Sequence, residues 1–229
     1  MRRGRVAGAS VAAALVVAVL GGCTLLRGPD YVPTPLPTPD ESAHEAAERY
    51  LGYLESGDAA SAALMIKSVV DHPEKVYAGA DLLTNEVYSA AVARIEDATI
   101  TDERDTSEYS TTVDVQYTLR GEKREGQFML DSSDGTWWVG TTANGSIFVT
   151  LAPPEGDAIP ATYEIAGQTV NLAKDGQEGF LLFPGIYSIT VDVPDSQVVD
   201  PTANPVTREI EIGFDINVTK VTIPVASAP

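Results

Sequence analysis

A change of hydrophobic period within the chain limits the possible folds most strongly. Residues 109–120 alternate between a largely apolar face and a polar face. The first face would carry Tyr109, Thr111, Val113, Val115, Tyr117 and Leu119. A period of two residues predicts a half-buried strand, and Asp134-Gly135 predicts a tight hairpin turn farther along. With further strands expected at 127–131 and 136–141 and a weaker one within 94–102, this part of the chain should form a meander of about four antiparallel strands.

Residues before the meander repeat at helical spacing. Ser42 and Glu45 stand at capping-box spacing. An apolar stripe follows at Ala43, Ala46, Ala47, Tyr50, Leu51 and Leu54. Asp58 is placed to cap a second helix reaching about residue 70, and Asp81 to open a third. Three helices and a meander predict an α+β domain at 41–142 in which a curved sheet wraps around the helices.

After Gly145 the pattern contains only short strands. The expected strands are 146–151, 162–166, 169–172, 179–182, 187–193, 208–214 and 217–223. Proline and glycine turn signals separate them. This spacing predicts a small all-β sandwich at 145–229.

Two stretches carry family resemblances. Residues 46–51 and 134–139, Ala-Ala-Glu-Arg-Tyr-Leu and Asp-Gly-Thr-Trp-Trp-Val, resemble NTF2-like or cystatin-like modules of bacterial lipoproteins. That resemblance implies a cone-shaped fold with a pocket between sheet and helices. Residues 183–187, Phe-Pro-Gly-Ile-Tyr, resemble a hairpin of PEGA-type and TcaA-like envelope modules. The first resemblance implies no particular activity, whereas a protein similar to TcaA-like envelope-stress proteins would be expected to contact cell-wall factors.

The leader supplies the clearest functional signal. Arg2, Arg3 and Arg5 precede an apolar run of about fifteen residues, which is short for a bilayer core that needs roughly twenty. The run ends in Leu-Gly-Gly-Cys, which resembles the lipobox of bacterial lipoproteins. The resemblance implies a signal peptide at 1–22, cleavage between Gly22 and Cys23, and a lipid on Cys23. An ordinary cleaved signal and an uncleaved anchor are the alternatives.

The composition of the chain limits the kinds of partner and bond that can be expected. The formal charge of −18 becomes −21 without the three leader arginines, so binding to nucleic acid through charge is not expected. Cys23 is the sole cysteine, so once lipidated the chain can form no disulfide. Residues 23–40 are rich in proline and predict an extended tether. A PxxP-type recognition peptide is the alternative for this segment.

Residues suited to catalysis or metal binding are sparse. His44 and His72 are the only histidines, and no zinc or nucleotide motif occurs, so neither a cofactor nor a metal site is expected. The stretch 131–135 is interpreted as a turn rather than a calcium loop, because the required later glutamate is missing. The acidic run Asp102, Glu103, Asp105 and Glu108 is interpreted as a solvated loop, with weak cation binding as the alternative.

Adjacent aromatic residues are the remaining candidates for contact. Trp137 and Trp138 should point to opposite faces of a strand, and the outward ring is either a contact residue or packed on a neighbouring element. The main hypothesis is a membrane-anchored extracytoplasmic lipoprotein that binds an envelope protein, wall polymer or small ligand without catalysis. The alternative is that a cone pocket makes the first domain an enzyme or small-molecule carrier.

Overall fold

The computed structural model describes residues 41–71, 82–140, 145–152, 162–171, 178–192, 206–214 and 219–224. All of these residues belong to one unit that extends from Pro33 to Pro229. The predicted signal peptide at 1–22 and tether at 23–40 lie outside the described residues. The predicted boundary between two domains, at 142–145, adjoins the undescribed residues 141–144.

One long helix begins the described chain. Helix α1 spans Ala43–Ser56, and Ser42 and Glu45 form the predicted capping box. Gly57 ends α1 in the left-handed conformation with φ of 81°, a backbone angle that glycine adopts at little cost. Helices α2 (Ala59–Ala63), α3 (Lys67–Asp71) and α4 (Asn85–Ser89) have five residues each. Asp58 caps α2 as predicted.

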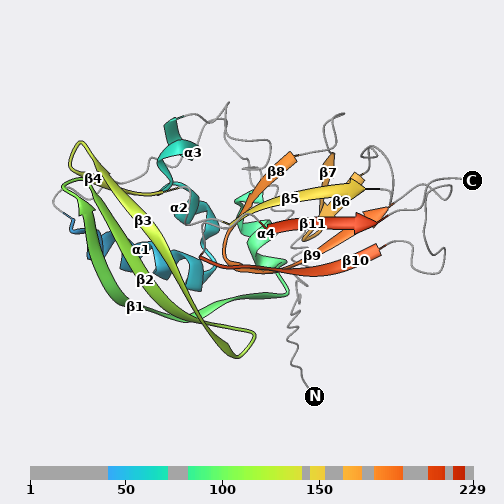
Figure 1. Cartoon of the computed structure of the whole chain (residues 1–229), viewed down its shortest axis with the longest axis horizontal. Helices are drawn as coiled ribbons and strands as arrows, with labels where there is room; N and C mark the ends of the chain where they lie inside the picture. The colour runs from blue at the N-terminus through green and yellow to red at the C-terminus, as the bar shows by residue number, and fades with distance from the viewer. Residues whose placement is uncertain are drawn as a thin grey trace, which may run out of the picture. The chain divides into compact units, whose positions relative to one another are not determined.

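Four antiparallel strands follow, of which the first three are long (Figure 1). They are β1 (Ala93–Ser107), β2 (Ser110–Leu119), β3 (Glu122–Ser133) and β4 (Thr136–Val139). Strand β2 alternates between buried and half-buried residues along its whole length, as its period predicted. The β3–β4 turn has positive φ angles of 54° at Asp134 and 77° at Gly135, which fits the predicted tight hairpin.

The remaining strands are short and divide between two sheets. They are β5 (Gly145–Ala152), β6 (Thr162–Ile165), β7 (Gln168–Asn171), β8 (Glu178–Leu182), β9 (Gly185–Asp192), β10 (Val206–Ile212) and β11 (Thr219–Pro224). One sheet has the order β4-β3-β2-β1-β9-β6-β7, with β10 also paired to β9. The other has the order β11-β5-β8, in which β11 and β5 are parallel.

The strands of the first half are joined to those of the second by the first residues of β1. Ala93 pairs with Ile186 and Arg94 with Gly185, so β1 and β9 are antiparallel neighbours in one eight-stranded sheet. One cluster of buried side chains contains residues of α1, of β1–β4 and of β9–β10. Packing therefore extends continuously through both halves of the described chain.

The expected fold class, an NTF2-like domain of three helices on a sheet followed by a small all-β sandwich, is wrong. Strands make up most of the described residues, and only α1 has more than five helical residues. Strand β9, expected in the sandwich, instead extends the sheet of the first half. Backbone pairing between strands far apart in sequence is not visible in hydrophobic period.

The second predicted helix shows why the spacing of apolar residues predicted a helix longer than the one observed. It stops at Ala63, and Ile66 forms a parallel bridge with Val139 of β4. The Val139 backbone N–H donates to the Met65 carbonyl at 2.8 Å. Pairing with the edge of β4 therefore interrupts the helix between α2 and α3, because an edge strand gains hydrogen-bond partners there.

The stretch at 183–187 is not a hairpin. Strand β8 before it pairs with β5, whereas β9 after it pairs with β1, β6 and β10. Phe183 and Pro184 thus carry the chain from one sheet to the other. The Tyr187 hydroxyl donates to the Phe183 carbonyl at 2.8 Å, which holds this corner closed.

Candidate functional site

Aromatic rings fill the space between α1 and the sheet, where the resemblance implied a pocket. Tyr50 of α1 lies 5.5 Å from Phe128 of β3 between ring centroids, and 6.5 Å from each of Phe183 and Phe214. All four side chains are essentially inaccessible to solvent. Phe183 and Phe214 come from the second half of the chain. The described interior between α1 and the sheet is therefore a packed aromatic core.

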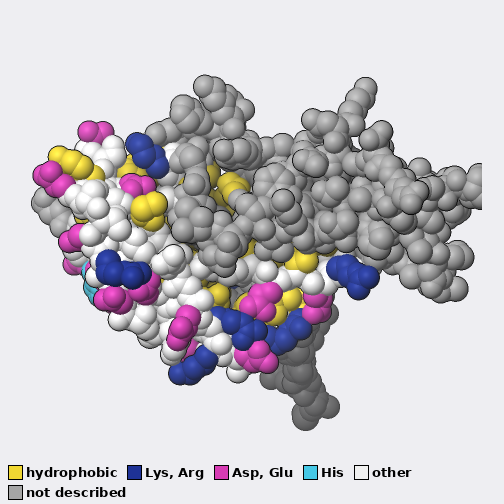
Figure 2. All heavy atoms as spheres, viewed as in Figure 1, with side chains coloured by type: hydrophobic (Ala, Val, Ile, Leu, Met, Phe, Trp, Pro, Cys, Tyr) yellow, Lys and Arg dark blue, Asp and Glu magenta, His cyan; other side chains and the backbone are white. Residues whose placement is uncertain are grey.

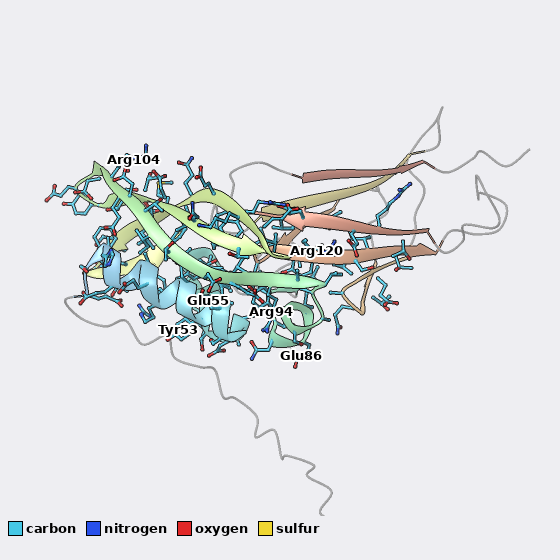
Figure 3. The ribbon with its side chains drawn as sticks, turned by 90° about the horizontal axis from the view of Figure 1, so that it is seen from below. Tyr53, Glu55, Glu86, Arg94, Arg104 and Arg120 are labelled. Atoms are coloured by element: carbon cyan, nitrogen blue, oxygen red, sulfur yellow. The ribbon has the colours of Figure 1, made fainter. Side chains whose placement is uncertain are left out.

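A surface groove lies on the other side of α1, between the helix and β1. The α1–β1 groove has a volume of about 350 Å³. Its lining consists of His44, Glu48, Leu51, Gly52, Glu55, Ala98, Thr99 and Ile100. The helical members lie at spacings of three or four residues, which places them on one side of α1. Figure 3 shows α1 running along β1, with Arg94 and Arg104 toward opposite ends of the strand.

The groove has an acidic rim and an apolar floor. Glu48 and Glu55 are exposed at the rim, whereas Leu51 is buried and Ile100 half-buried. Gly52 leaves the middle of the helical wall open, because a Cβ added there would meet no atom within 4 Å. Among the described residues, no lysine or arginine lines this groove.

His44 connects the helix to the strand at one end of the groove. Its Nδ1 contacts the Glu103 carboxylate, and its Nε2 lies 3.4 Å from the Glu48 carboxylate. The hydrogen bond that His44 donates to Glu103 and the negative charges of Glu103 and Glu48 raise the pKa of His44 above its ordinary value of 6.5. The imidazole is thus held in its charged form to a higher pH than a free histidine.

Glu55 closes the other end of the groove through a backbone contact. Its Oε1 accepts a hydrogen bond of 2.7 Å from the Ala98 backbone N–H. From Glu96 to Ser107, β1 pairs only with β2 among the described strands, so its other edge has no strand partner. The Glu55 carboxylate takes the place that a carbonyl of a neighbouring strand would occupy.

The strands carry paired charges of both signs at their surface. Arg104 of β1 donates to Asp114 of β2 at 2.8 Å, and Arg124 of β3 donates to Glu211 of β10 at 2.7 Å. The Arg124 guanidinium lowers the pKa of Glu211. Figure 2 shows acidic and basic side chains beside one another on the face in view. Such intermixing favours solubility over binding of one charged ligand.

The two tryptophans point to opposite faces, as their adjacency predicted. Trp137 packs against the core cluster, and both rings are half-buried. The Lys67 ammonium of α3 lies 5.1 Å from the Trp138 ring centroid, within cation–π range. Trp138 therefore contacts a neighbouring helix, and its role as a contact aromatic residue stays a prediction.

The remaining sequence candidates are dispersed. Asp102, Glu103 and Asp105 lie in β1 rather than in a loop, and Asp105 accepts a hydrogen bond from the Thr111 hydroxyl. Residues 131–135 form the end of β3 and its turn. Among the described residues, no group of acidic, histidine or cysteine side chains is placed to hold a metal ion. Gly22, Cys23 and His72 lie outside the described residues.

Sequence reasoning missed the groove itself. Glu48 and Glu55 were indistinguishable from other solvated helix positions, because only a weaker strand was expected within 94–102 and its position beside the helix was not predicted. Gly52 was the available signal, since an exposed glycine within a helix costs about 1 kcal/mol relative to alanine.

Comparisons leave the functional class open. No family model matches the chain, and no curated protein is significantly similar to it. No helix within the described ranges is both long enough and apolar enough to span a bilayer.

Proposed function

We propose that this chain is a lipid-anchored, extracytoplasmic protein of the bacterial cell envelope that binds partners at its surface and is not an enzyme. The anchor is a lipid on Cys23, placed there by the Leu-Gly-Gly-Cys motif after a basic and apolar leader. A diacylglycerol on a cysteine carries two acyl chains, which is enough to attach a polar domain to a membrane without a spanning helix.

The observation that carries the surface-binding part is the position of Phe183 and Phe214. Their rings lie 6.5 Å from that of Tyr50, in the interior that an enzyme or carrier of the expected kind would keep open. Small-molecule sites are usually concave cavities lined by apolar and a few polar groups. A filled interior supports a surface mode of action and weakens the carrier alternative.

The anchor is tested by mass spectrometry of the protein isolated from its own cells. We expect a product that begins at Cys23 and carries a diacylglycerol thioether, and a Cys23→Ser variant that loses the lipid and the membrane association. An intact leader, or an unmodified Cys23 thiol at the membrane, would contradict the proposed lipid anchor and its extracytoplasmic location.

The binding part is tested by crosslinking the lipidated protein in its own cells. We expect recovery of one envelope protein or wall polymer, in equal amounts from the wild type and from a variant altered on β3, Glu125→Gln. Turnover of a small substrate by the purified chain, or saturable uptake of an apolar ligand into its interior, would contradict the proposal.

A further inference from the structure

We propose that the α1–β1 groove is the docking site for a short, extended segment of a partner polypeptide that carries basic side chains. The inference rests on the proposed function, because it names the place and chemistry of its surface contact. Three features of the groove point to this occupant: an open strand edge, a gap in the helical wall, and an acidic rim.

The open edge supplies backbone hydrogen-bonding groups. The Ala98 N–H points to the α1 side, because Glu55 Oε1 accepts from it at 2.7 Å. An extended peptide that adds to a sheet edge offers carbonyl groups to such N–H groups. On docking, a peptide carbonyl can replace the Glu55 carboxylate, which is then free to pair with a basic side chain of the peptide.

The length of the contact is limited by the shape of β1. Its register with β2 shifts between Glu96 and Thr99 and again between Ile100 and Asp102. Bulges of this kind bend an edge strand and prevent long, flat pairing with another sheet. Ala98 lies within the first shift, and Thr99 and Ile100 follow it directly, so this part of the edge fits a short segment and not a whole strand.

Gly52 provides the room for a side chain of the partner. It lies within α1, is exposed, and would place an added Cβ in open space. Glycine destabilises a helix interior relative to alanine, and the packing of α1 gives no reason for it here. The gap lies beside the buried Leu51, which belongs to the apolar floor of the groove. An aliphatic side chain of the partner can fill the gap and cover this floor.

The negative charge of the groove favours a basic peptide segment as its occupant over a second copy of this acidic chain. Glu48 and Glu55 line the rim and Glu103 lies beside it, whereas the only basic group in the lining is His44. The chain has a formal charge of −18, so two copies repel each other at an acidic groove. Attraction between opposite charges favours a lysine- or arginine-bearing partner.

The test uses the full chain in neutral detergent and a short, end-capped peptide of alternating lysine and valine. Amide chemical shifts of the protein are followed during titration to millimolar peptide. We expect the largest changes at Ala98, Thr99 and Ile100 and along the groove side of α1. No change, or changes centred on another surface, would overturn the proposal.

Control peptides separate strand addition from simple charge attraction. The same peptide with N-methylated backbone amides on alternate residues should bind more weakly by at least about tenfold, because the methyl groups keep the peptide backbone from approaching the edge and remove its N–H donors. A peptide of alternating glutamate and valine should not bind. Equal affinity for the methylated peptide would mean non-specific charge attraction and would overturn docking at the edge.

Matched variants locate the site on the chain. Gly52→Phe should abolish binding by filling the groove, whereas Gly52→Ala should retain most of it. Glu48→Gln should weaken binding by about two- to fivefold at low salt, as expected for an exposed ion pair, and Glu125→Gln on β3 should not. Unaltered binding by a folded Gly52→Phe variant would contradict the groove.

The result can be told apart from the tests of the proposed function. Lipidation of Cys23 does not depend on the groove, and crosslinking detects a partner wherever on the chain it binds. If the protein is lipidated and crosslinks to a partner but does not bind the peptide, only the docking site is refuted. If the native product is not lipidated, the membrane location is refuted, and the peptide measurement still tests the docking site.

Discussion

The Phe214 carbonyl accepts a hydrogen bond of 3.0 Å from the backbone N–H of Gln127. This bond brings the chain after β10 across β3, where Gly126 leaves space for it. A Cβ at Gly126 would lie 2.5 Å from the Phe214 carbonyl oxygen and 2.8 Å from the Phe214 Cβ. The close approach lets the Phe214 ring enter the core of the first half of the chain.

Replacing Gly126 tests that approach. We expect Gly126→Ala to lower the free energy of unfolding by about 1–3 kcal/mol, because the added methyl group displaces backbone that cannot move freely. Urea denaturation measures the loss. The matched control, Gly52→Ala, meets no atom and should leave stability unchanged or raise it by up to about 1 kcal/mol. Equal effects of both changes would contradict this explanation.

Removing the Phe214 ring should destabilise both halves together. Its ring lies 5.2 Å from that of Tyr117 and 5.5 Å from that of Phe128. Phe214→Ala should cost about 3–5 kcal/mol in unfolding free energy, and Phe214→Leu clearly less. Fluorescence and circular dichroism should follow one transition in the wild type. Two separate transitions would show that the ring does not couple the halves.

The corner between the two sheets depends on one buried hydroxyl. Tyr187→Phe removes the donor to the Phe183 carbonyl and leaves a buried acceptor without that partner. We expect a loss of about 1–3 kcal/mol in thermal or chemical unfolding. Tyr109→Phe is the control, because Tyr109 is 61% exposed and should change stability by less than about 0.5 kcal/mol. A stability loss as small as the control's would show that the hydroxyl is not needed.

The contact between His44 and Glu103 should appear as a shifted titration. Because the folded pKa is raised above 6.5, the contact stabilises the fold fully below the ordinary pKa, and this contribution is lost as pH rises through the folded pKa. Nuclear magnetic resonance titration of the imidazole measures the pKa directly. Glu103→Gln should lower the pKa of His44, and Glu125→Gln should not change it.

Salt provides a second check on His44. The group is exposed, so added salt should move its pKa back toward the ordinary value by screening Glu48 and Glu103. A pKa that stays at its ordinary value in low salt would contradict the contact.

Local structure was determined by the sequence alone. The Ser42 capping box, the Asp58 cap, the alternation of β2 and the Asp134-Gly135 turn all occur as predicted. Each depends on residues within a few positions of one another, since caps, turns and hydrophobic period are set by local backbone geometry. The leader motif at Cys23 is likewise a local signal, and its lipidation stays a prediction.

Only the tertiary structure decided how these elements combine. Pairing of Ala93 with Ile186 joins two expected modules in one sheet, and Phe183 and Phe214 fill the expected pocket from a distant part of the chain. The groove likewise needs Glu55 and Ala98, which are 43 residues apart. Such contacts depend on which surfaces meet when apolar area is buried, and local spacing carries no information about that choice.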